Sequence, residues 1–424
     1  MPPPTEAEAV ALEAGAAAVP GELIVRFDAG LDAADRRRIR ERARAEFGQA
    51  LPGAGLQVVN LGSGDSLHAA EARFEREKGV LYAEPNVYRR ASRPADGPYF
   101  DQLWALQNSG QTLVGVTGTS DADPDAVEAW DLTTGSADVT VAIVDSGIDT
   151  THPDLSANAW TNPGETGSGR EANGRDDDGN GLVDDRRGWD WSDGDGDPAD
   201  ANGHGTHVAG TVGARGGNGT GTAGVSWNVR LMPLRVLDRY GSGTLDDVVG
   251  AYAYAARNGA RVVNMSFGGN RFSRAEYDAI RSASEVLFVA AAGNNGQDSD
   301  VAPAYPCAYD LDNVVCVAAS DQRDALAGFS NYGARSVDLA APGVNVLSTQ
   351  PGAAYGYADG TSMATPHVTG AAALVLARRP AASPSDVKGA LLGSVDPGSS
   401  LVGKTVTGGR LNVRTALDAP APGP

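Results

Sequence analysis

The sequence predicts a large α/β domain built on a doubly wound parallel sheet, preceded by a small α+β domain. After residue 96, stretches rich in Val, Ile and Ala alternate with helical stretches. Continuous apolar strands separated by helices indicate a parallel sheet that is covered on both faces. Before residue 92, strand and helix patterns alternate in a shorter segment. The 424 residues suffice for one domain of about 250 to 330 residues and a smaller one.

The small domain is expected at residues 21–92. Its strands are predicted at 22–27, 56–61 and 80–88, and its helices at 32–47 and 66–78. Residues 1–20, rich in Ala, Pro and Glu, predict a disordered tail, and a linker containing Pro, Gly and Asp follows at 91–98.

The large domain is expected at residues 96–418, with a second disordered tail at 419–424. Its strands are predicted at 139–144, 230–237, 262–267, 286–291 and 314–319. The clearest helices are predicted at 245–257 and 361–378. No run of eighteen apolar residues exists, so we expect no membrane span.

The net charge of −20 excludes the dense basic surface that a nucleic-acid partner requires. Residues 1–95 hold 13 Lys and Arg against 14 Asp and Glu, which leaves 21 against 40 for the remainder. The acidity therefore lies in the large domain. Carboxylates bunched in loops predict cation sites, whereas dispersed ones form a solvated surface.

The two cysteines, Cys307 and Cys316, lie nine residues apart across a loop. This separation allows a disulfide, and two reduced core thiols are the alternative. Residues 1–20 lack the basic and apolar regions of a signal peptide, so either it has been removed or the protein stays inside. We expect a secreted monomer.

Three segments of the large domain carry residue types suited to nucleophilic catalysis. Asp145 follows the predicted strand 139–144, His204 lies at the start of a helix among small residues, and Ser362 opens the predicted helix 361–378. A serine hydroxyl needs an adjacent imidazole as base, and the imidazole needs a carboxylate to hold its tautomer. Asp145, His204 and Ser362 supply these roles.

These segments, in the order Asp, His, Ser, resemble the subtilisin family of serine proteases, of the thermitase and subtilisin type. The resemblance implies a serine endopeptidase of broad specificity acting on proteins and peptides. Ala-Ala-Gly-Asn-Asn-Gly at 291–296 resembles the family segment whose Asn completes the oxyanion hole, which implies that role for Asn294. A catalytically inactive binding module of the same fold is the alternative, and the presence of every catalytic residue type argues against it.

The resemblance also implies the substrate-binding residues, which are Ser266, Phe267, Gly268, Ala292 and Gly293. These small or apolar residues favour an apolar or aromatic side chain before the scissile bond. Asp298 and Asp300 lie close in sequence, which leaves tolerance of basic residues open.

The small domain resembles a subtilisin-type inhibitory propeptide through residues 20–27 and 82–86. Such a domain would assist folding of a sheet with many long-range contacts and then inhibit as an intramolecular partner. The chain would be a zymogen that cuts itself between Tyr88 and Pro98. An unrelated, permanent accessory domain is the alternative.

Acidic clusters predict at least two Ca²⁺ sites, with an acidic solvated insertion as the alternative. The first follows the opening of a calcium loop, with the candidate ligands Asp176, Asp178, Asn180, Leu182, Asp184 and Asp185, but Arg187 stands where such a loop has Glu. The second, which resembles a loop of thermitase-like subtilases, comprises Asp190, Asp193, Asp195 and Asp197. Family resemblance implies a third site with Asp154, for which Asp96 and the loop at Asn218 are further candidate ligands.

Two further motif matches fit no function. Residues 398–405 satisfy the nucleotide-binding P-loop pattern, but Gly408 and Gly409 follow where a long helix should begin. Residues 64–67 mimic the start of an esterase motif, and Ser66 or Asp65 is better explained as a helix N-cap.

Overall fold

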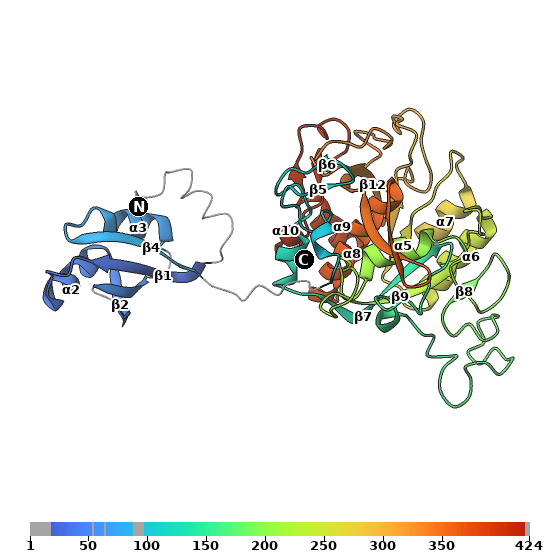
Figure 1. Ribbon diagram of the computed structural model, residues 1–424, viewed down its shortest axis with the longest axis horizontal. Helices are drawn as coiled ribbons and strands as arrows, with labels where there is room; N and C mark the ends of the chain where they lie inside the picture. The colour runs from blue at the N-terminus through green and yellow to red at the C-terminus, as the bar shows by residue number, and fades with distance from the viewer. Residues whose placement is uncertain (1–17, 53–54, 63–64, 88–96, 420–424) are drawn as a thin grey trace. The chain divides into compact units, whose positions relative to one another are not determined.

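The computed structural model describes residues 18–52, 55–62, 65–87 and 97–419, which Figure 1 draws as ribbon. The chain forms two compact units, Met1–Arg93 and Pro94–Pro424. Of the two predicted tails, residues 1–17 and 420–424 lie outside the described residues, whereas residues 18–20 already belong to the first strand, so the first tail ends earlier than predicted. The predicted cleavage region also lies outside the described residues, apart from residues 97 and 98. None of the described helices is long and apolar enough to cross a membrane.

The small unit is a four-stranded antiparallel sheet packed against two helices. In chain order it consists of β1 (Ala18–Phe27), α2 (Ala33–Arg42), β2 (Ala45–Ala50), β3 (Leu56–Leu61), α3 (Leu67–Glu75) and β4 (Val80–Val87). The sheet order is β2-β3-β1-β4. Its core contains Leu23, Val25 and Phe27 from β1 with Phe74 from α3. The predicted small α+β domain is confirmed.

The predicted helix 32–47 is wrong at its end. The helix stops at Arg42, because Arg44 adopts a left-handed backbone conformation (φ 59°) that a helix cannot continue. The next residues form β2, in which Ala45 pairs with Leu61 of β3. Pairing with a distant strand thus overrides a local helix pattern. Ser66 caps α3 by accepting the Ala69 N–H at 3.1 Å, as predicted.

A nine-stranded sheet forms the centre of the large unit, in the order β16-β17-β13-β12-β11-β10-β7-β9-β8. All neighbouring strands from β17 to β8 are parallel. The strands are β7 (Gly135–Asp145), β8 (Trp189–Asp190), β9 (Asn228–Arg235), β10 (Val262–Met265), β11 (Leu287–Ala291), β12 (Val314–Ser320), β13 (Leu339–Pro342), β16 (Asp396–Pro397) and β17 (Gly409–Arg410). The predicted parallel sheet is confirmed.

Helices cover both faces of this sheet. They are α4 (Ala126–Trp130), α5 (His204–Gly213), α6 (Leu245–Arg257), α7 (Arg274–Ser282), α8 (Thr361–Arg378), α9 (Pro384–Leu392) and α10 (Val413–Asp418). One core joins Val141 and Ile143 of β7 to α5, α8, α9 and α10. The other joins Ala142 and Val144 of β7 to α6 and α7. Adjacent residues of one strand therefore enter opposite cores, as a doubly wound sheet requires.

The predicted helices 245–257 and 361–378 have the bounds of α6 and α8. Two predicted strands end earlier than expected, for physical reasons. After Arg235 the chain leaves the sheet, because the Val236 and Leu237 N–H groups both bond to the Asp145 carbonyl, at 2.9 and 3.1 Å. After Met265 the chain leaves β10, and the Ser266 carbonyl is occupied by Ser362.

The remaining parts of the large unit are short. A hairpin of β14 (Val346–Gln350) and β15 (Ala354–Ala358) lies beside α5, and β5 (Thr112–Leu113) pairs with β6 (Val116–Thr117). Two single 3₁₀ turns are η1 (Phe100–Gln102) and η2 (Ser156–Asn158). The P-loop-like residues 398–405 form turns between β16 and β17 rather than a strand leading into a helix. That excludes phosphate binding of the P-loop kind.

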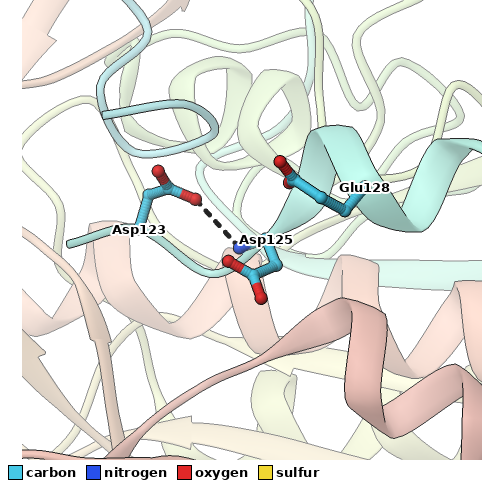
Figure 2. Close-up of side chains that lie close together, drawn as sticks. All are labelled: Asp123, Asp125 and Glu128. Atoms are coloured by element: carbon cyan, nitrogen blue, oxygen red, sulfur yellow. Dashed lines mark hydrogen bonds between the residues drawn. The ribbon is translucent and has the colours of Figure 1, made fainter. Parts of the chain in front are cut away.

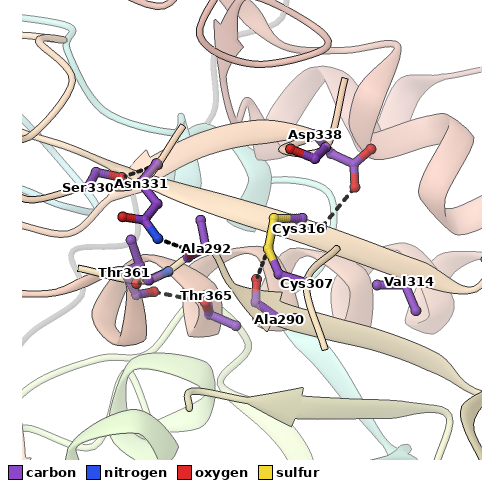
Figure 3. Close-up of a disulfide and its surroundings, with 12 residues drawn as sticks. Ala290, Ala292, Cys307, Val314, Cys316, Ser330, Asn331, Asp338, Thr361 and Thr365 are labelled. Carbon is purple, nitrogen blue, oxygen red and sulfur yellow. Dashed lines mark hydrogen bonds between the residues drawn. A yellow bond between two sulfur atoms is a disulfide. The ribbon is translucent and has the colours of Figure 1, made fainter. Parts of the chain in front are cut away.

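Cys307 and Cys316 are joined by a disulfide, which decides between the two alternatives that the sequence left open. Figure 3 shows the bond beside Ala290, the fourth residue of β11, while the Cys316 N–H donates to Asp338 at 2.8 Å. The disulfide therefore ties the loop after β11 to the next strand, β12.

Candidate active site

The candidate catalytic residues gather where three neighbouring parallel strands end. Asp145 is the last residue of β7, Ser266 directly follows β10, and Asn294 is the third residue after β11. Because these strands are adjacent and parallel, their carboxyl ends meet at one edge of the sheet. The helices α5 and α8 begin with His204 and Thr361, so the N-terminus of each carries a further candidate residue.

Asp145 and His204 form a hydrogen-bonded pair in which the carboxylate is buried and the imidazole is partly exposed. The Asp145 side chain is 0 % exposed, and its Oδ1 lies 2.7 Å from His204 Nδ1. A carboxylate only accepts, so Nδ1 carries the proton and Nε2 is left as the basic nitrogen. The Asp145 charge raises the pKa of His204 above its usual value, and burial opposes this only in part. The pair therefore has the geometry of a base held by a carboxylate.

Ser362 is the second residue of α8 and is held by a reciprocal pair of hydrogen bonds. Its Oγ donates to the Ser266 carbonyl at 2.8 Å, and the Ser266 hydroxyl donates to the Ser362 carbonyl at 2.9 Å. The Ser362 carbonyl is available because Pro366, four residues on, has no N–H to donate within the helix. None of the hydrogen bonds among the described residues joins Ser362 to His204.

Asn294 is oriented by the start of α8. Its Oδ1 accepts from both the N–H and the hydroxyl of Thr361, each at 2.9 Å, so its Nδ2 is the group left to face the site. Gly360, at φ 150°, precedes them. This backbone conformation is one that residues with a Cβ rarely adopt, which explains the glycine directly before Thr361.

Asn331, which the sequence reasoning missed, holds the segment that carries Asn294. Its Nδ2 donates to the Ala292 carbonyl at 2.9 Å, as Figure 3 shows, and its Oδ1 accepts from the Asn295 and Gln297 N–H groups, both at 3.0 Å. Gly293, at φ 103°, packs so closely that a Cβ would lie 2.5 Å from this amide. Asn331 stands in a loop without periodicity, so no sequence signal points to it.

The predicted substrate-binding residues lie at the same edge. Ser266, Phe267 and Gly268 leave β10, while Ala292 and Gly293 leave the adjacent β11. Next to them, Gly269 and Tyr305 exchange backbone hydrogen bonds of 2.8 and 2.7 Å. Phe272, which is 52 % exposed, packs its ring against that of Tyr305 with the ring centroids 5.5 Å apart.

The first acidic loop uses two of its predicted ligands for its own backbone. The Asp176 carboxylate accepts from three N–H groups of the loop, those of Gly179, Asn180 and Gly181. The Asp184 carboxylate accepts the N–H groups of Asn173 and Gly174, both at 2.9 Å. The Leu182 N–H donates to the Asn180 side chain at 2.7 Å.

The structure brings the other two carboxylates of this loop, Asp178 and Asp185, to a third one, Glu165. One oxygen from each lies within 4.8 Å of the others. Asp185 also accepts from Asn162, Asn180 and Tyr254. Burial raises the pKa of Glu165, and the charges of Asp185 and Asp177 add to the effect. Glu165 lies eleven residues before Asp176, beyond the reach of a loop-motif search.

The second acidic segment is balanced by an arginine. The Arg235 guanidinium contacts Asp190, and it lies 2.8 Å from Asp193. Asp195 accepts the Asp197 N–H at 3.0 Å. At the third expected site, buried Asp154 accepts from the Asn218 side chain, the Thr222 N–H and the Tyr355 hydroxyl, each at 2.9 Å. Asp96 lies outside the described residues.

Another acidic group, unpredicted from sequence, comprises Asp123, Asp125 and Glu128 (Figure 2). Burial is the largest cause that raises the pKa of Asp123 to about 6 and that of Asp125 to about 7. Both Asp123 oxygens accept backbone N–H groups, those of Asn108 and Asp125. Asp125 accepts the Asn412 amide at 2.7 Å. These contacts indicate a structural role for the group, and none of its buried side-chain oxygens lacks a hydrogen-bond partner.

Comparison with known proteins finds a family match for each of the two units. The Subtilase family profile matches residues 136–412, and that of the Fervidolysin N-terminal prodomain matches residues 4–86. The chain is 36 % identical to "Thermophilic serine proteinase" of Bacillus sp. (strain AK1), over 84 % of this chain and 78 % of that protein. It is 37 % identical to thermitase of Thermoactinomyces vulgaris, over 69 % and 92 % respectively.

A solved protease of Pseudoalteromonas arctica PAMC 21717 superposes with a TM-score of 0.60 at 30 % identity, over 76 % of this chain and 98 % of that one. The profile match, the identities to two full-length relatives and the shared fold agree with one another. The chain therefore belongs to the subtilase family, and it is a serine endopeptidase with an N-terminal prodomain.

Proposed function

We propose that Ser362, His204 and Asp145 form the catalytic triad of this endopeptidase. The observation that carries the proposal is the 2.7 Å contact between buried Asp145 and His204 at the end of β7, while Ser362 in α8 hydrogen-bonds to Ser266 at the end of the adjacent strand β10. His204 Nε2 takes the proton of the Ser362 hydroxyl as Oγ attacks the substrate carbonyl. His204 then gives that proton to the departing amine, and water repeats the cycle on the acyl-enzyme. A rotation about the Ser362 side chain from Ser266 toward His204 precedes attack.

Asn294 Nδ2 and the Ser362 backbone N–H stabilise the oxyanion of the tetrahedral intermediate. Asn294 suits this role because Thr361 occupies its Oδ1 and so fixes which end of the amide faces the site. Donors held in place before the reaction need no reorganisation when negative charge develops.

The substrate lies extended along the segments after β10 and β11, with an apolar or aromatic side chain before the scissile bond. Ser266, Gly268, Ala292 and Gly293 are small and leave room for such a side chain, and Phe267 among them is apolar. Asp300 was one reason why a basic substrate side chain stayed an alternative. Its carboxylate accepts the Ser336 hydroxyl at 2.7 Å and forms an ion pair with Arg335. Its charge is therefore already compensated.

The chain acts as a secreted, monomeric zymogen. The prodomain inhibits the peptidase domain of the same chain, and the triad removes it by cutting between residues 88 and 98. The match of residues 4–86 to a prodomain profile supports this proposal. The acidic loops bind Ca²⁺, since they offer only oxygen ligands, which hard cations prefer. The ion neutralises carboxylates there and takes no part in the reaction.

Substitution of the proposed nucleophile and oxyanion donor tests the function. We expect Ser362→Ala to lose activity on casein on the order of a millionfold, and Asn294→Ala to lose about a hundred- to a thousandfold in kcat with little change in KM; both magnitudes are those known for subtilisin itself. A fluorophosphonate should label the processed wild-type protein and fail to label Ser362→Ala. Equal labelling of both, or near-wild-type activity of Ser362→Ala, would contradict the triad and favour an inactive binding module.

A further inference from the structure

The long segment between η2 and β8, green in Figure 1, holds a group of carboxylates that lacks any counter-charge. It comprises Glu165, Asp178 and Asp185, with one oxygen of each within 4.8 Å of the others. Among the described residues, no Lys or Arg forms an ion pair with any of the three, whereas Arg235 neutralises Asp190 and Asp193 in the neighbouring segment. Their hydrogen-bond partners are neutral amides and a hydroxyl, which do not balance three negative charges.

A second observation, at Glu165, points to a missing ligand. This side chain is 0 % exposed, and its Oε2 has no hydrogen-bond partner. Its Oε1 accepts the N–H groups of Asp177 and Asp178 at 2.7 and 3.2 Å, so the carboxylate is fixed in place. A buried carboxylate oxygen without any donor is costly unless something occupies the space before it.

The backbone is shaped to bring these residues together. Gly164 packs against Asp178 so closely that a Cβ would lie 2.5 Å from the Asp178 Cβ. Asn162 donates to Asp178 and Asp185 at 2.8 and 3.0 Å and thereby links both sides of the loop. On the inner side, the Tyr254 hydroxyl of α6 donates to Asp185 at 2.6 Å and connects the group to the core.

We propose that Glu165, Asp178 and Asp185 bind one calcium ion. Of the two candidate ligands Asp184 and Asp185 that follow each other in the loop, only Asp185 then contacts the ion, and Glu165 joins it from outside the loop. The inference deepens the calcium binding proposed above and rests on it only for the kind of cation. Ca²⁺ contacts oxygen at 2.3–2.6 Å, so ligands on opposite sides of one ion are about 5 Å apart, which suits this spacing. Mg²⁺ requires a tighter octahedron and is expected to bind poorly.

Terbium luminescence provides a readout that is local to this site. Tyr254, which contacts Asp185, packs against Trp160 and Trp191 with ring centroids 6.3 and 5.8 Å apart. These rings can sensitise Tb³⁺, a Ca²⁺ substitute, bound at the carboxylates. The measurement uses full-length protein carrying Ser362→Ala, so that autolysis does not interfere and the result does not depend on peptidase activity.

Two matched variants in this background decide between ligand sets. We expect Glu165→Gln to weaken Ca²⁺ competition for sensitised Tb³⁺ at least about tenfold and to bind one Ca²⁺ fewer per chain after dialysis against calcium that saturates the parent. Asp184→Asn makes the same charge change beside Asp185 and should stay within about twofold of the parent, with an unchanged ion count. In chelator, Glu165→Gln should melt no lower than the parent, because it removes an uncompensated charge.

The opposite pattern would overturn the inference. If Glu165→Gln keeps the parent's ion count, Glu165 is no ligand, whatever happens to stability. If Asp184→Asn alone loses the ion, the shell is the one the loop motif predicts. Gly164→Ala gives an independent check, because it displaces Asp178 without changing charge and should also weaken Ca²⁺ competition. A parent protein that binds no Tb³⁺ or Ca²⁺ would refute the site and leave the proposed triad untouched.

Discussion

Single contacts at the candidate active site have consequences that can be measured, beginning with Asp145 and His204. The buried carboxylate holds the imidazole proton on Nδ1 and raises the pKa of His204. Since the folded-state pKa is raised, protonated His204 contributes stability that is fully present below its ordinary pKa of about 6.5 and is lost as pH rises through the raised value. Activity has the opposite dependence, because a general base must be neutral.

We expect kcat/KM to rise with pH through a midpoint above about 6.5. In Asp145→Asn, loss of the negative charge should move this midpoint to lower pH and reduce kcat about ten-thousandfold, because the imidazole tautomer is no longer held. Profiles of kcat/KM between pH 5 and 9 on a chromogenic peptide would test this. If the midpoint of the kcat/KM profile stays at the same pH in Asp145→Asn, Asp145 does not set the pKa of His204.

Asn331 acts on the reaction only through the segment that bears Asn294. We therefore expect Asn331→Ala to lower kcat about 10- to 100-fold with a smaller change in KM, since a displacement of about 1 Å is enough to misplace an oxyanion donor. The double variant Asn294→Ala/Asn331→Ala should lose little beyond Asn294→Ala alone. Fully multiplicative losses in kcat would instead assign Asn331 a general structural role.

At the scale of elements, the loops after parallel strands are held by neighbouring elements rather than by their own periodicity. The start of α8 orients Asn294, and Pro366 within α8 frees the Ser362 carbonyl for Ser266. The loop after β11 is closed by the disulfide between Cys307 and Cys316 (Figure 3). The geometry of the site thus depends on cross-links between successive strand and helix ends.

Removing this disulfide should destabilise the large unit. A loop of nine residues corresponds to about 2 to 3 kcal/mol of unfolding free energy on the chain-entropy estimate. We expect Cys307→Ala/Cys316→Ala to lose this amount in guanidinium unfolding, in the Ser362→Ala background. Reductant should lower the stability of the parent and leave the double variant unchanged. A parent indifferent to reductant after unfolding and refolding would contradict a stabilising disulfide.

At the scale of the whole molecule, two units with separate cores share one chain, and the second carries the active site. A sheet with parallel neighbours from β17 to β8 joins residues far apart in sequence, which slows folding. A prodomain that assists folding and then inhibits is consistent with this topology. On the proposed mechanism, its removal requires the same nucleophile that acts on other substrates.

We expect Ser362→Ala to remain at full length, while the wild type converts to a form that starts between Arg89 and Tyr99. Intact-mass analysis of both proteins over time would follow the conversion. Asn294→Ala is the matched control, since it should mature slowly but to the same N-terminus. A shortened Ser362→Ala protein in a protease-free preparation would refute self-processing.

Local sequence patterns were sufficient to predict much of the fold of this protein. The two helices at 245–257 and 361–378 were predicted with their observed bounds, because each is continuous in sequence; the first buries one face and the second is buried on nearly all sides. Asp145, His204 and Ser362 could be proposed from the sequence because the residues that mark each of them are immediate neighbours in the chain. The alternation of apolar strands and helices likewise determined the doubly wound architecture.

Tertiary structure decided whatever depends on contacts between distant residues. Strand β2 exists because β3 pairs with it, Asn331 matters because it meets Ala292 across the chain, and Glu165 joins Asp178 only through a folded loop. Arg235 similarly neutralises Asp190 and Asp193, although it lies far from both in the sequence. Periodicity and short motifs report on residues within a turn or a strand of each other. Counter-charges and supporting hydrogen bonds depend on which distant segments of the chain come into contact in the fold. Short-range sequence patterns do not contain that information.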